Sequence, residues 1–297
     1  MRVYITGATG FIGSHVAREL GERGHEVYDE RVDLLDPERL ERAMEGCEAL
    51  VHVAALYSYR APDEEHELVN VVGTRNVLDA ARAMGIERIV HTSTAGTCGP
   101  VFGRPATETD EPPVWELGVP YKRTKLAAER LALAAGAIVV NPTTPVGEGD
   151  RRPTPTGRMI ADVASGRIRG YLGSTGLNVV DVRDVARGHA LALELGTPGE
   201  RYILGGVNLP LQEIFAAIAD LAGRRRPSVR VPYRVAMAAA RMRLANSNEV
   251  RLARLPMYFS SEKAENFLGY LPGPVGPALA RAVGEALSMI TNGKGGA

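Results

Sequence analysis

The chain alternates between short runs that are apolar throughout and longer runs in which apolar residues recur every three or four positions. The first pattern predicts buried strands, and the second predicts helices with one apolar face. We expect strands at 3–6, 25–29, 49–55, 88–94 and 137–142, and helices at 11–24, 36–46, 70–85 and 121–136. Apolar strands separated by helices are typical of a parallel sheet that is covered on both faces. The pattern therefore predicts an α/β fold with a Rossmann-type, doubly wound parallel sheet.

The pattern changes after residue 142. Residues 142–157 are rich in proline and glycine, and a loop of this length usually has a function. Beyond it we expect a helix near 158–166, a strand at 178–182, a helix at 184–195, a strand at 201–206 and a helix at 210–223. We predict a dinucleotide-binding domain over residues 1–141, with a returning segment near 178–195. A smaller mixed α/β domain over 142–297 would then bind most of the substrate.

Three glycines, Gly7, Gly10 and Gly13, lie between the first strand and the first helix. Free N–H groups and the macrodipole attract phosphate to a helix N-terminus. We predict that Gly7 permits a tight turn, that Gly10 lets a pyrophosphate approach the backbone, and that Gly13 lets the helix pack closely. Phe11 and Ile12, which open the helix, complete this group of cofactor candidates. The GxxGxxG spacing is a variant of the dinucleotide fingerprint, and glycines with a purely structural role are the simpler alternative.

Two further patterns supply candidate catalytic and ligand-binding side chains near the glycine-rich turn. Tyr121 and Lys125 are four residues apart and share a helix face. A nearby ammonium stabilises a phenolate and lowers the pKa of the phenol, which makes Tyr121 a candidate acid/base. The segment "HTSTAGTCG" places Thr92, Ser93 and Thr94 at the end of a strand, where open α/β sheets bind ligands. An exposed ion-pairing helix and ordinary turn chemistry are the simpler alternatives for these two patterns.

The composition of the chain limits which kinds of molecule the protein is expected to bind. Among 297 residues, Lys and Arg together number 35, as do Asp and Glu, so the formal net charge is zero. Such a chain has no global field that would attract nucleic acid or an anionic membrane, and no apolar run approaches the roughly 20 residues of a membrane span. Two cysteines without an export signal indicate a reducing cytoplasm. We therefore expect a cytoplasmic protein that binds a small molecule, without metal, nucleic acid or membrane.

Several blocks occur in an order that resembles the extended short-chain dehydrogenase/reductase family of NAD(P)-dependent epimerases, dehydratases and reductases. They are "TGATGFIG", "DLLDPERL", "HVAA", "NVVGTRNVL", "YKRTKLAAE", "VVDVRDVARGHALALE" and "YILGG". More narrowly, "NPTTPVGEGDRRPTPTGRMI" and "FSSEKAENFLGY" look like hopanoid-associated sugar epimerases, a branch similar to dihydroflavonol reductases. The resemblance implies a homodimer paired through helices 70–85 and 121–136.

The resemblance also implies roles for individual residues. Tyr121 would be the catalytic acid/base, and Lys125 would bind the nicotinamide ribose. Thr94 would hydrogen-bond the substrate oxygen, with Ser93 as a second candidate. The implied cofactor contacts further along the chain are Asp33, Leu34, Ala54, Ala55, Thr92 and Asn141. Asn141 stands where many members of the family have arginine, so it becomes a candidate polar contact to substrate or nicotinamide.

The choice of dinucleotide depends on the residues after the second predicted strand. Asp29 or Glu30 would favour NAD, whereas Arg31 could hold the 2′-phosphate of NADP, unless it is only a solvated turn residue. The compact segment "DERVDLLD" is similar to that of GDP-fucose synthases, which use NADP. We therefore expect NAD(P) as the cofactor, with a leaning to NADP.

Ala95 and Gly96 follow Thr94, where the resemblance leads one to expect an acidic pair in dehydratases, so dehydration is disfavoured. The first hypothesis is an epimerase that transiently oxidises and re-reduces a nucleotide-activated sugar. An NADPH-dependent carbonyl reductase resembling dihydroflavonol reductases is the alternative, and a non-catalytic cofactor-binding regulator is a third. Arginines near 142–158 could clamp a diphosphate or only solubilise the loop. The substrate candidates are Tyr57, Ser93, Thr94, Arg158 and Arg183.

Overall fold

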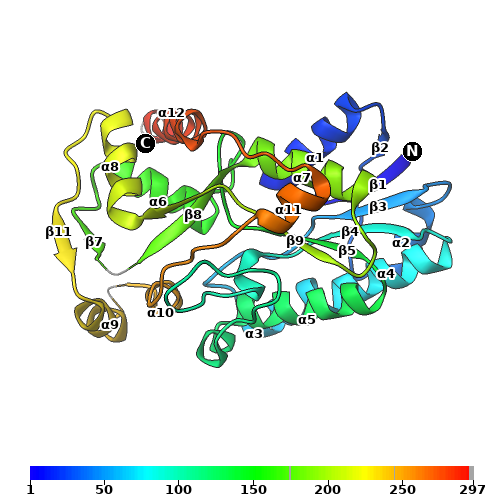
Figure 1. The fold of residues 1–297 in the computed structure, drawn as a ribbon, viewed down its shortest axis with the longest axis horizontal. Helices are drawn as coiled ribbons and strands as arrows, with labels where there is room; N and C mark the ends of the chain where they lie inside the picture. Colours follow the sequence, from blue (N-terminus) through cyan, green and yellow to red (C-terminus); the bar gives the residue numbers. More distant parts are fainter. Residues whose placement is uncertain (174, 244, 294–297) are drawn as a thin grey trace.

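The computed structural model describes residues 1–173, 175–243 and 245–293. The strands are β1 Arg2–Thr6, β2 Glu26–Tyr28, β3 Ala49–His52, β4 Arg88–Thr92, β5 Ile138–Pro142, β6 Thr144–Val146, β7 Gly170–Leu172, β8 Gly176–Asp181, β9 Arg201–Leu204, β10 Val207–Pro210 and β11 Val229–Val231. The α-helices are α1 Phe11–Glu22, α2 Pro37–Ala43, α3 Asp63–His66, α4 Gly73–Ala83, α5 Pro120–Ala134, α6 Pro155–Ala164, α7 Val182–Leu195, α8 Leu211–Leu221, α9 Tyr233–Arg241, α10 Ser247–Leu252, α11 Glu262–Leu268 and α12 Val275–Gly293. Figure 1 shows how these elements are arranged.

Six strands form the main sheet in the order β2-β1-β3-β4-β5-β9, and every neighbouring pair is parallel. The chain moves outward from β1 to β2 and then crosses back to β3 on the other side of β1. Ligands of such sheets bind outside the carboxyl ends of the strands, at the point where the order reverses. The predicted Rossmann-type parallel sheet is thus confirmed, and its topology places a crevice beside β1 and β3.

Helices cover both faces of this sheet, with α1 and α7 on one face and α2, α4 and α5 on the other (Figure 1). Because side chains alternate along a strand, β1 supplies both cores. Val3 and Ile5 are buried in the core under α1 and α7, whereas Tyr4 is buried in the core under α2 and α4. Burial on both faces explains why the strands are apolar throughout.

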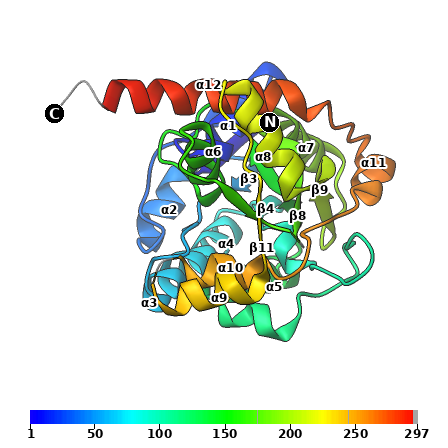
Figure 2. The same ribbon diagram turned by 90° about the vertical axis from the view of Figure 1, so that its left-hand side faces the viewer.

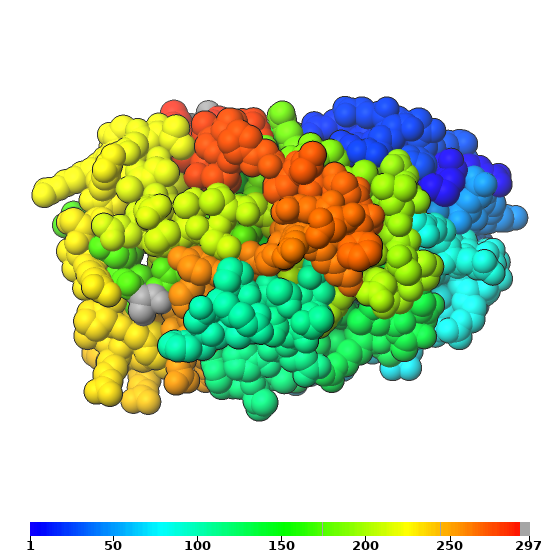
Figure 3. All heavy atoms as spheres, in the orientation of Figure 1, coloured from blue at the N-terminus to red at the C-terminus, as the bar shows by residue number. Residues whose placement is uncertain are grey.

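The rest of the chain builds a second core beside the sheet. A three-stranded sheet in the order β10-β8-β6 and the pair β11-β7 pack with α6, α8 and α12. Figure 2 shows α12 on one side of this part and α9 and α10 on the other. Figure 3 shows the orange stretch that carries α11 lying across this face of the molecule. The boundary at residues 141 and 142 remains a prediction, and β9, from beyond that boundary, completes the six-stranded sheet.

Two elements differ from expectation in ways that affect the site. The strand expected at 49–55 ends at His52, which leaves residues 53–55 as a loop at the carboxyl edge of the sheet. The helix expected at 70–85 begins earlier, as a π-helical segment over Glu67–Val72 that continues into α4. No helix among the described residues is both long and apolar enough to cross a membrane.

Candidate functional site

A cavity of about 980 Å³ opens at the carboxyl ends of the main-sheet strands and extends toward α6, β8 and α10. Most of the residues predicted from the sequence line it. They are Gly7, Gly10, Phe11, Ile12, Gly13, Arg31, Asp33, Leu34, Ala54, Ala55, Tyr57, Thr92, Ser93, Thr94, Tyr121 and Lys125. Segments from β1, β3, β4 and α5 therefore meet at one edge of the sheet.

The turn from β1 to α1 is built to leave backbone open to this cavity. Gly7 has φ of +75°, and the Gly10 N–H donates to its carbonyl at 2.9 Å. A Cβ at Gly13 would overlap that same carbonyl, so close packing at this position needs glycine. Gly10 precedes α1 without a side-chain cap, and the first N–H groups of a helix have no partner within the helix. These donors and the positive end of the helix fit a pyrophosphate.

Residues that follow β2 form another part of the cavity wall. Asp29, Glu30, Arg31, Asp33 and Leu34 line the cavity together. The Glu30 carboxylate faces the Arg39 guanidinium at 3.5 Å, and an Asp33 carboxylate oxygen accepts the Leu35 N–H at 3.0 Å. Within the described parts of the chain, no carboxylate lies within ion-pair distance of Arg31.

The candidate acid/base group lies at the start of α5. Tyr121 is 9% exposed, and its ring lies 4.7 Å, centroid to centroid, from the ring of Tyr57. Burial raises the pKa of Tyr121, Tyr57 raises it further, and the Thr94 side chain acts in the opposite direction. Burial also lowers the pKa of Lys125 from its usual 10.5 to about 8. The expectation that Lys125 lowers the pKa of Tyr121 is wrong in this arrangement, because the ammonium donates to the Thr92 carbonyl at 2.7 Å instead.

Two hydroxyl groups after β4 are available to a ligand. Thr94 Oγ1 accepts the Gly96 N–H at 3.2 Å, and its hydroxyl faces the Tyr121 phenol in the cavity, where the O–H can donate to a ligand. The Ser93 hydroxyl is buried and has no hydrogen-bond partner within the described structure, although Ser93 lines the cavity. Buried polar groups in folded proteins are almost always paired. This unpaired hydroxyl therefore fits a site that is completed by a bound molecule.

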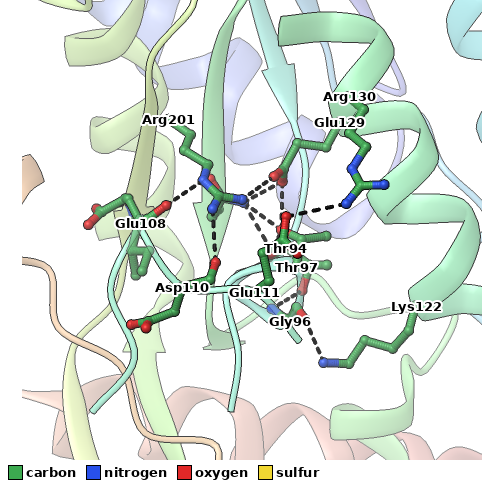
Figure 4. A network of polar contacts seen from close by, with 12 residues as sticks. Thr94, Gly96, Thr97, Glu108, Asp110, Glu111, Lys122, Glu129, Arg130 and Arg201 are labelled. Atoms are coloured by element: carbon green, nitrogen blue, oxygen red, sulfur yellow. Dashed lines mark hydrogen bonds and ion pairs between the residues drawn. The ribbon is translucent and has the colours of Figure 1, made fainter. Parts of the chain in front are cut away.

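Asn141 is not part of the cavity wall. Its amide nitrogen donates to the Thr94 carbonyl at 3.1 Å and to Glu129 Oε2 at 2.7 Å. Glu129 also accepts from Thr97 at 2.6 Å and pairs with Arg201 at 2.6 Å (Figure 4). The predicted contact from Asn141 to the cofactor or substrate is thus corrected, because Asn141 does not line the cavity and buried partners behind Thr94 take its amide nitrogen.

Two arginines predicted as substrate contacts also lie outside the lining. Arg158 donates to the Pro153 carbonyl at 2.7 Å, and Arg183 pairs with Glu148 at 2.7 Å. Neither arginine is among the lining residues, although the charge of Arg158 acts on the Tyr57 phenol, which does line the cavity. Arg152, from the same loop, is the arginine of this segment that does line it. No group of three or more His, Cys, Asp or Glu among the described residues could hold a metal ion.

Sequence reasoning missed most of the substrate half of the cavity. Its apolar lining comes from segments far apart in the chain, which no periodicity connects: Tyr59, Val69, Met159, Leu177, Leu211, Leu252, Met257 and Phe259. It also missed Lys122, which lines the cavity beside Tyr121. One available signal was composition, because only four of the 35 Lys and Arg residues are lysines, and Lys122 and Lys125 are two of them.

Comparison with known proteins agrees with this geometry. A model of the NAD dependent epimerase/dehydratase family matches residues 3–205. A Synechocystis sp. protein with the provisional name dihydroflavonol 4-reductase is 36% identical, with 94% of this chain and 93% of that protein covered. The crystal structure of gox2253 is 40% identical, covers 99% of each chain and has a TM-score of 0.85. A nucleoside-diphosphate-sugar epimerase structure from Pseudomonas aeruginosa is 25% identical, covers 99% of this chain and 98% of that one, and has a TM-score of 0.82.

Proposed function

The chain belongs to the NAD-dependent epimerase/dehydratase family, and from that premise we propose that it is an NAD(P)H-dependent reductase of a ketone carried by a largely apolar substrate. The observation that carries the proposal is the lining beyond Tyr121 and Thr94, where aromatic and aliphatic side chains predominate. A nucleotide diphosphate needs cations to pair with its charges, and of Arg152, Arg158 and Arg183 only Arg152 is among the described lining residues. The relative with the provisional dihydroflavonol 4-reductase name supports the same choice.

The protonation state of the site also favours reduction. The dinucleotide, when bound, supplies the hydride. Because burial raises the pKa of Tyr121, its phenol is protonated at neutral pH and is ready to donate a proton to the oxygen that becomes the alcohol. The Thr94 O–H can hydrogen-bond the same oxygen, and the Lys125 ammonium, fixed on the Thr92 carbonyl, can hold the ribose. An oxidation would first require the less favoured phenolate.

The residues after β2 support NADPH as the preferred cofactor. Glu30 faces Arg39, whereas no carboxylate of the described chain pairs with Arg31. A guanidinium without an ion-pair partner beside the adenine end of the cavity is suited to a 2′-phosphate. The expected homodimer and the cytoplasmic location stay predictions.

Epimerisation of a nucleotide-activated sugar is the second candidate. The 25% identical sugar epimerase structure, the Arg152 that lines the cavity and the small residues Ala95 and Gly96 favour it. An epimerase must keep its dinucleotide between two half-reactions, whereas a reductase must exchange it in every turnover. Retention of the cofactor therefore separates the two candidates.

The test incubates the purified protein with NADPH and a panel of apolar ketones: dihydroquercetin, acetophenone and a long-chain 3-oxo ester. A parallel reaction contains UDP-glucose without added dinucleotide, and Tyr121→Phe is the control for both. We expect NADPH to be consumed in proportion to the alcohol formed from at least one ketone. Epimer formation by protein that retains its dinucleotide, with no ketone reduced, would overturn the proposal in favour of the second candidate.

A further inference from the structure

The scarcity of lysine makes its placement informative. The sequence contains four lysines, at 122, 125, 263 and 294, and uses arginine for its other basic side chains. Lys125 matches the predicted YxxxK pair, but nothing in that pair requires a lysine at position 122. Lys122 is nevertheless 3% exposed and lies next to Tyr121 on α5. A chain that otherwise prefers arginine has therefore buried an ammonium beside its candidate acid/base.

The surroundings of Lys122 match the geometry of an ammonium. Its Nζ donates to the Gly96 carbonyl at 2.8 Å and the Gly99 carbonyl at 3.2 Å, and it lies 2.7 Å from Glu116 Oε2. Three oxygens thus surround one nitrogen, two as hydrogen-bond acceptors and one as an ion-pair partner. The planar fork of arginine could not place its donors on these three oxygens from one compact point.

Lys122 joins one wall of the cavity to a segment behind it that does not line the cavity. Gly96 and Gly99 belong to the turn after β4, where the 3-10 turn Ala95–Thr97 lies, whereas Glu116 belongs to the 3-10 segment Val114–Gly118 that precedes α5. Burial lowers the pKa of Lys122, and Glu116 acts in the opposite direction. Because a buried charge without its partner costs several kcal/mol, separating Lys122 from Glu116 is unfavourable. The ion pair therefore keeps the two segments together.

Gly96 connects this ammonium to the candidate substrate-binding hydroxyl. Its N–H donates to Thr94 Oγ1, and its carbonyl accepts from Lys122 (Figure 4). A Cβ at Gly96 would lie 2.5 Å from Lys122 Nζ, so only glycine lets the ammonium approach this closely. Lys122 therefore holds the Gly96–Thr97 peptide, and that peptide adjoins the Ala95–Gly96 peptide whose N–H occupies a lone pair of Thr94 Oγ1.

We propose that Lys122 is a positioning residue for Thr94: by holding the Gly96–Gly99 turn, it keeps the Thr94 hydroxyl oriented so that its hydrogen is donated to the substrate oxygen. The inference rests on the proposed function in one respect, namely that Thr94 binds the oxygen that is reduced. Lys122 itself touches neither the substrate oxygen nor the dinucleotide in this role. Its effect on turnover must therefore pass through Thr94.

The first test needs no substrate. Amide hydrogen exchange at Gly96 is measured by NMR in the wild-type protein and in Lys122→Met combined with Glu116→Gln, which removes both charges and leaves no unpaired carboxylate. Loss of a charged hydrogen bond predicts exchange that is faster by roughly 10- to 100-fold at Gly96. Lys263→Met is the matched control, because Lys263 lies on α11 and pairs there with Glu200 from before β9, and it should leave Gly96 exchange unchanged. Unchanged exchange in the double variant would overturn the proposed clamp.

The second test is a double-mutant cycle with Thr94→Val, in which kcat is measured on the best ketone of the panel. Removing the Lys122–Glu116 pair should lower kcat roughly 10- to 100-fold when Thr94 is present and by less than about 3-fold when Thr94 is valine. Lys122→Arg should not restore the rate, since its donors cannot reach the three oxygens. NADPH affinity, measured by fluorescence titration, should be unchanged in every variant and also checks that each one is folded.

The outcomes separate this inference from the proposed function. Equal losses of kcat in both Thr94 backgrounds, or full rescue by Lys122→Arg, would overturn the positioning role while ketone reduction stands. If the wild-type protein reduces no ketone but Gly96 exchange responds as expected, the proposed function fails and the clamp on the turn remains. Loss of NADPH binding together with activity would assign Lys122 a merely structural role and would also overturn the proposal.

Discussion

Arg201→Met should destabilise the protein far more than the loss of an ordinary ion pair. The Arg201 side chain is 16% exposed and reaches Glu129, which is 1% exposed. It also donates to the carbonyls of Glu108 at 2.7 Å and Asp110 at 2.9 Å. Methionine fills much of the same volume but satisfies none of these acceptors, so the variant leaves a buried carboxylate without its counter-ion.

The size of the effect follows from that burial. Removing one partner of a buried ion pair costs about 3–5 kcal/mol, whereas a native protein is stable by only about 5–15 kcal/mol. With a urea m-value near 2 kcal/mol/M, the midpoint of unfolding should fall by roughly 2 M. The double variant Arg201→Met, Glu129→Gln no longer has the unpaired carboxylate. It should recover part of the lost stability, because substitutions at two residues in contact do not have additive effects on the free energy of unfolding.

Urea unfolding followed by fluorescence measures this directly, since Trp115 is the only tryptophan in the sequence. Arg226→Met is the matched control, because Arg226 makes a similar 2.6 Å ion pair with Asp220 on the exposed surface. That control should behave like the wild-type protein. If Arg201→Met also unfolded at the wild-type midpoint, the buried network behind Thr94 would not contribute to stability as argued.

Three further predictions concern the cofactor and the catalytic groups. Tyr121→Phe should lower turnover roughly 10²- to 10⁴-fold with NADPH affinity unchanged in a fluorescence titration, and a variant that kept most of its rate would remove Tyr121 from the mechanism. Arg31→Ser should weaken NADPH binding by about 1.5–3 kcal/mol and leave NADH binding unchanged in calorimetry; equal losses for both cofactors would contradict the 2′-phosphate assignment. Burial lowers the pKa of Lys125 to about 8 from its usual 10.5. As the pH rises, the Lys125 ammonium therefore loses its proton at a lower pH in the folded protein than in the unfolded chain. The wild-type free energy of unfolding, relative to that of Lys125→Met, should therefore rise by about 3 kcal/mol between pH 8 and 10.5, and a flat or falling difference would refute the burial of a titrating amine.

The sequence predicted the sheet well because its signals are local. A strand buried on both faces is apolar at every position, and Gly7 must take a positive φ at the turn, so both patterns are readable without tertiary structure. Asp36 was expected to begin a helix, and its carboxylate does accept the Arg39 N–H at 3.2 Å. Such features depend only on neighbours in the chain.

The errors concern contacts between distant segments. Asn141 was expected at the ligand because it stands where the resembling family often has arginine, but its amide nitrogen donates to Glu129, twelve residues earlier on α5. The pKa of Tyr121 was expected to fall because Lys125 shares its helix face, yet burial dominates and the ammonium faces Thr92. Helical spacing specifies which residues are neighbours on one surface, but not which acceptor a long side chain will choose.

The late arrival of β9 in the main sheet has a consequence for synthesis. β5 ends at Pro142, and the strand that pairs with its outer edge ends at Leu204, about 60 residues later. At 5–20 residues per second, a ribosome needs roughly 3–12 s to deliver that strand. During this interval β5 presents an unpaired edge, which is a template for aggregation, and Glu129 lacks its ion-pair partner Arg201. A fragment that stops near residue 142 should keep that exposed edge permanently, so residues 1–142 should express poorly as an isolated piece.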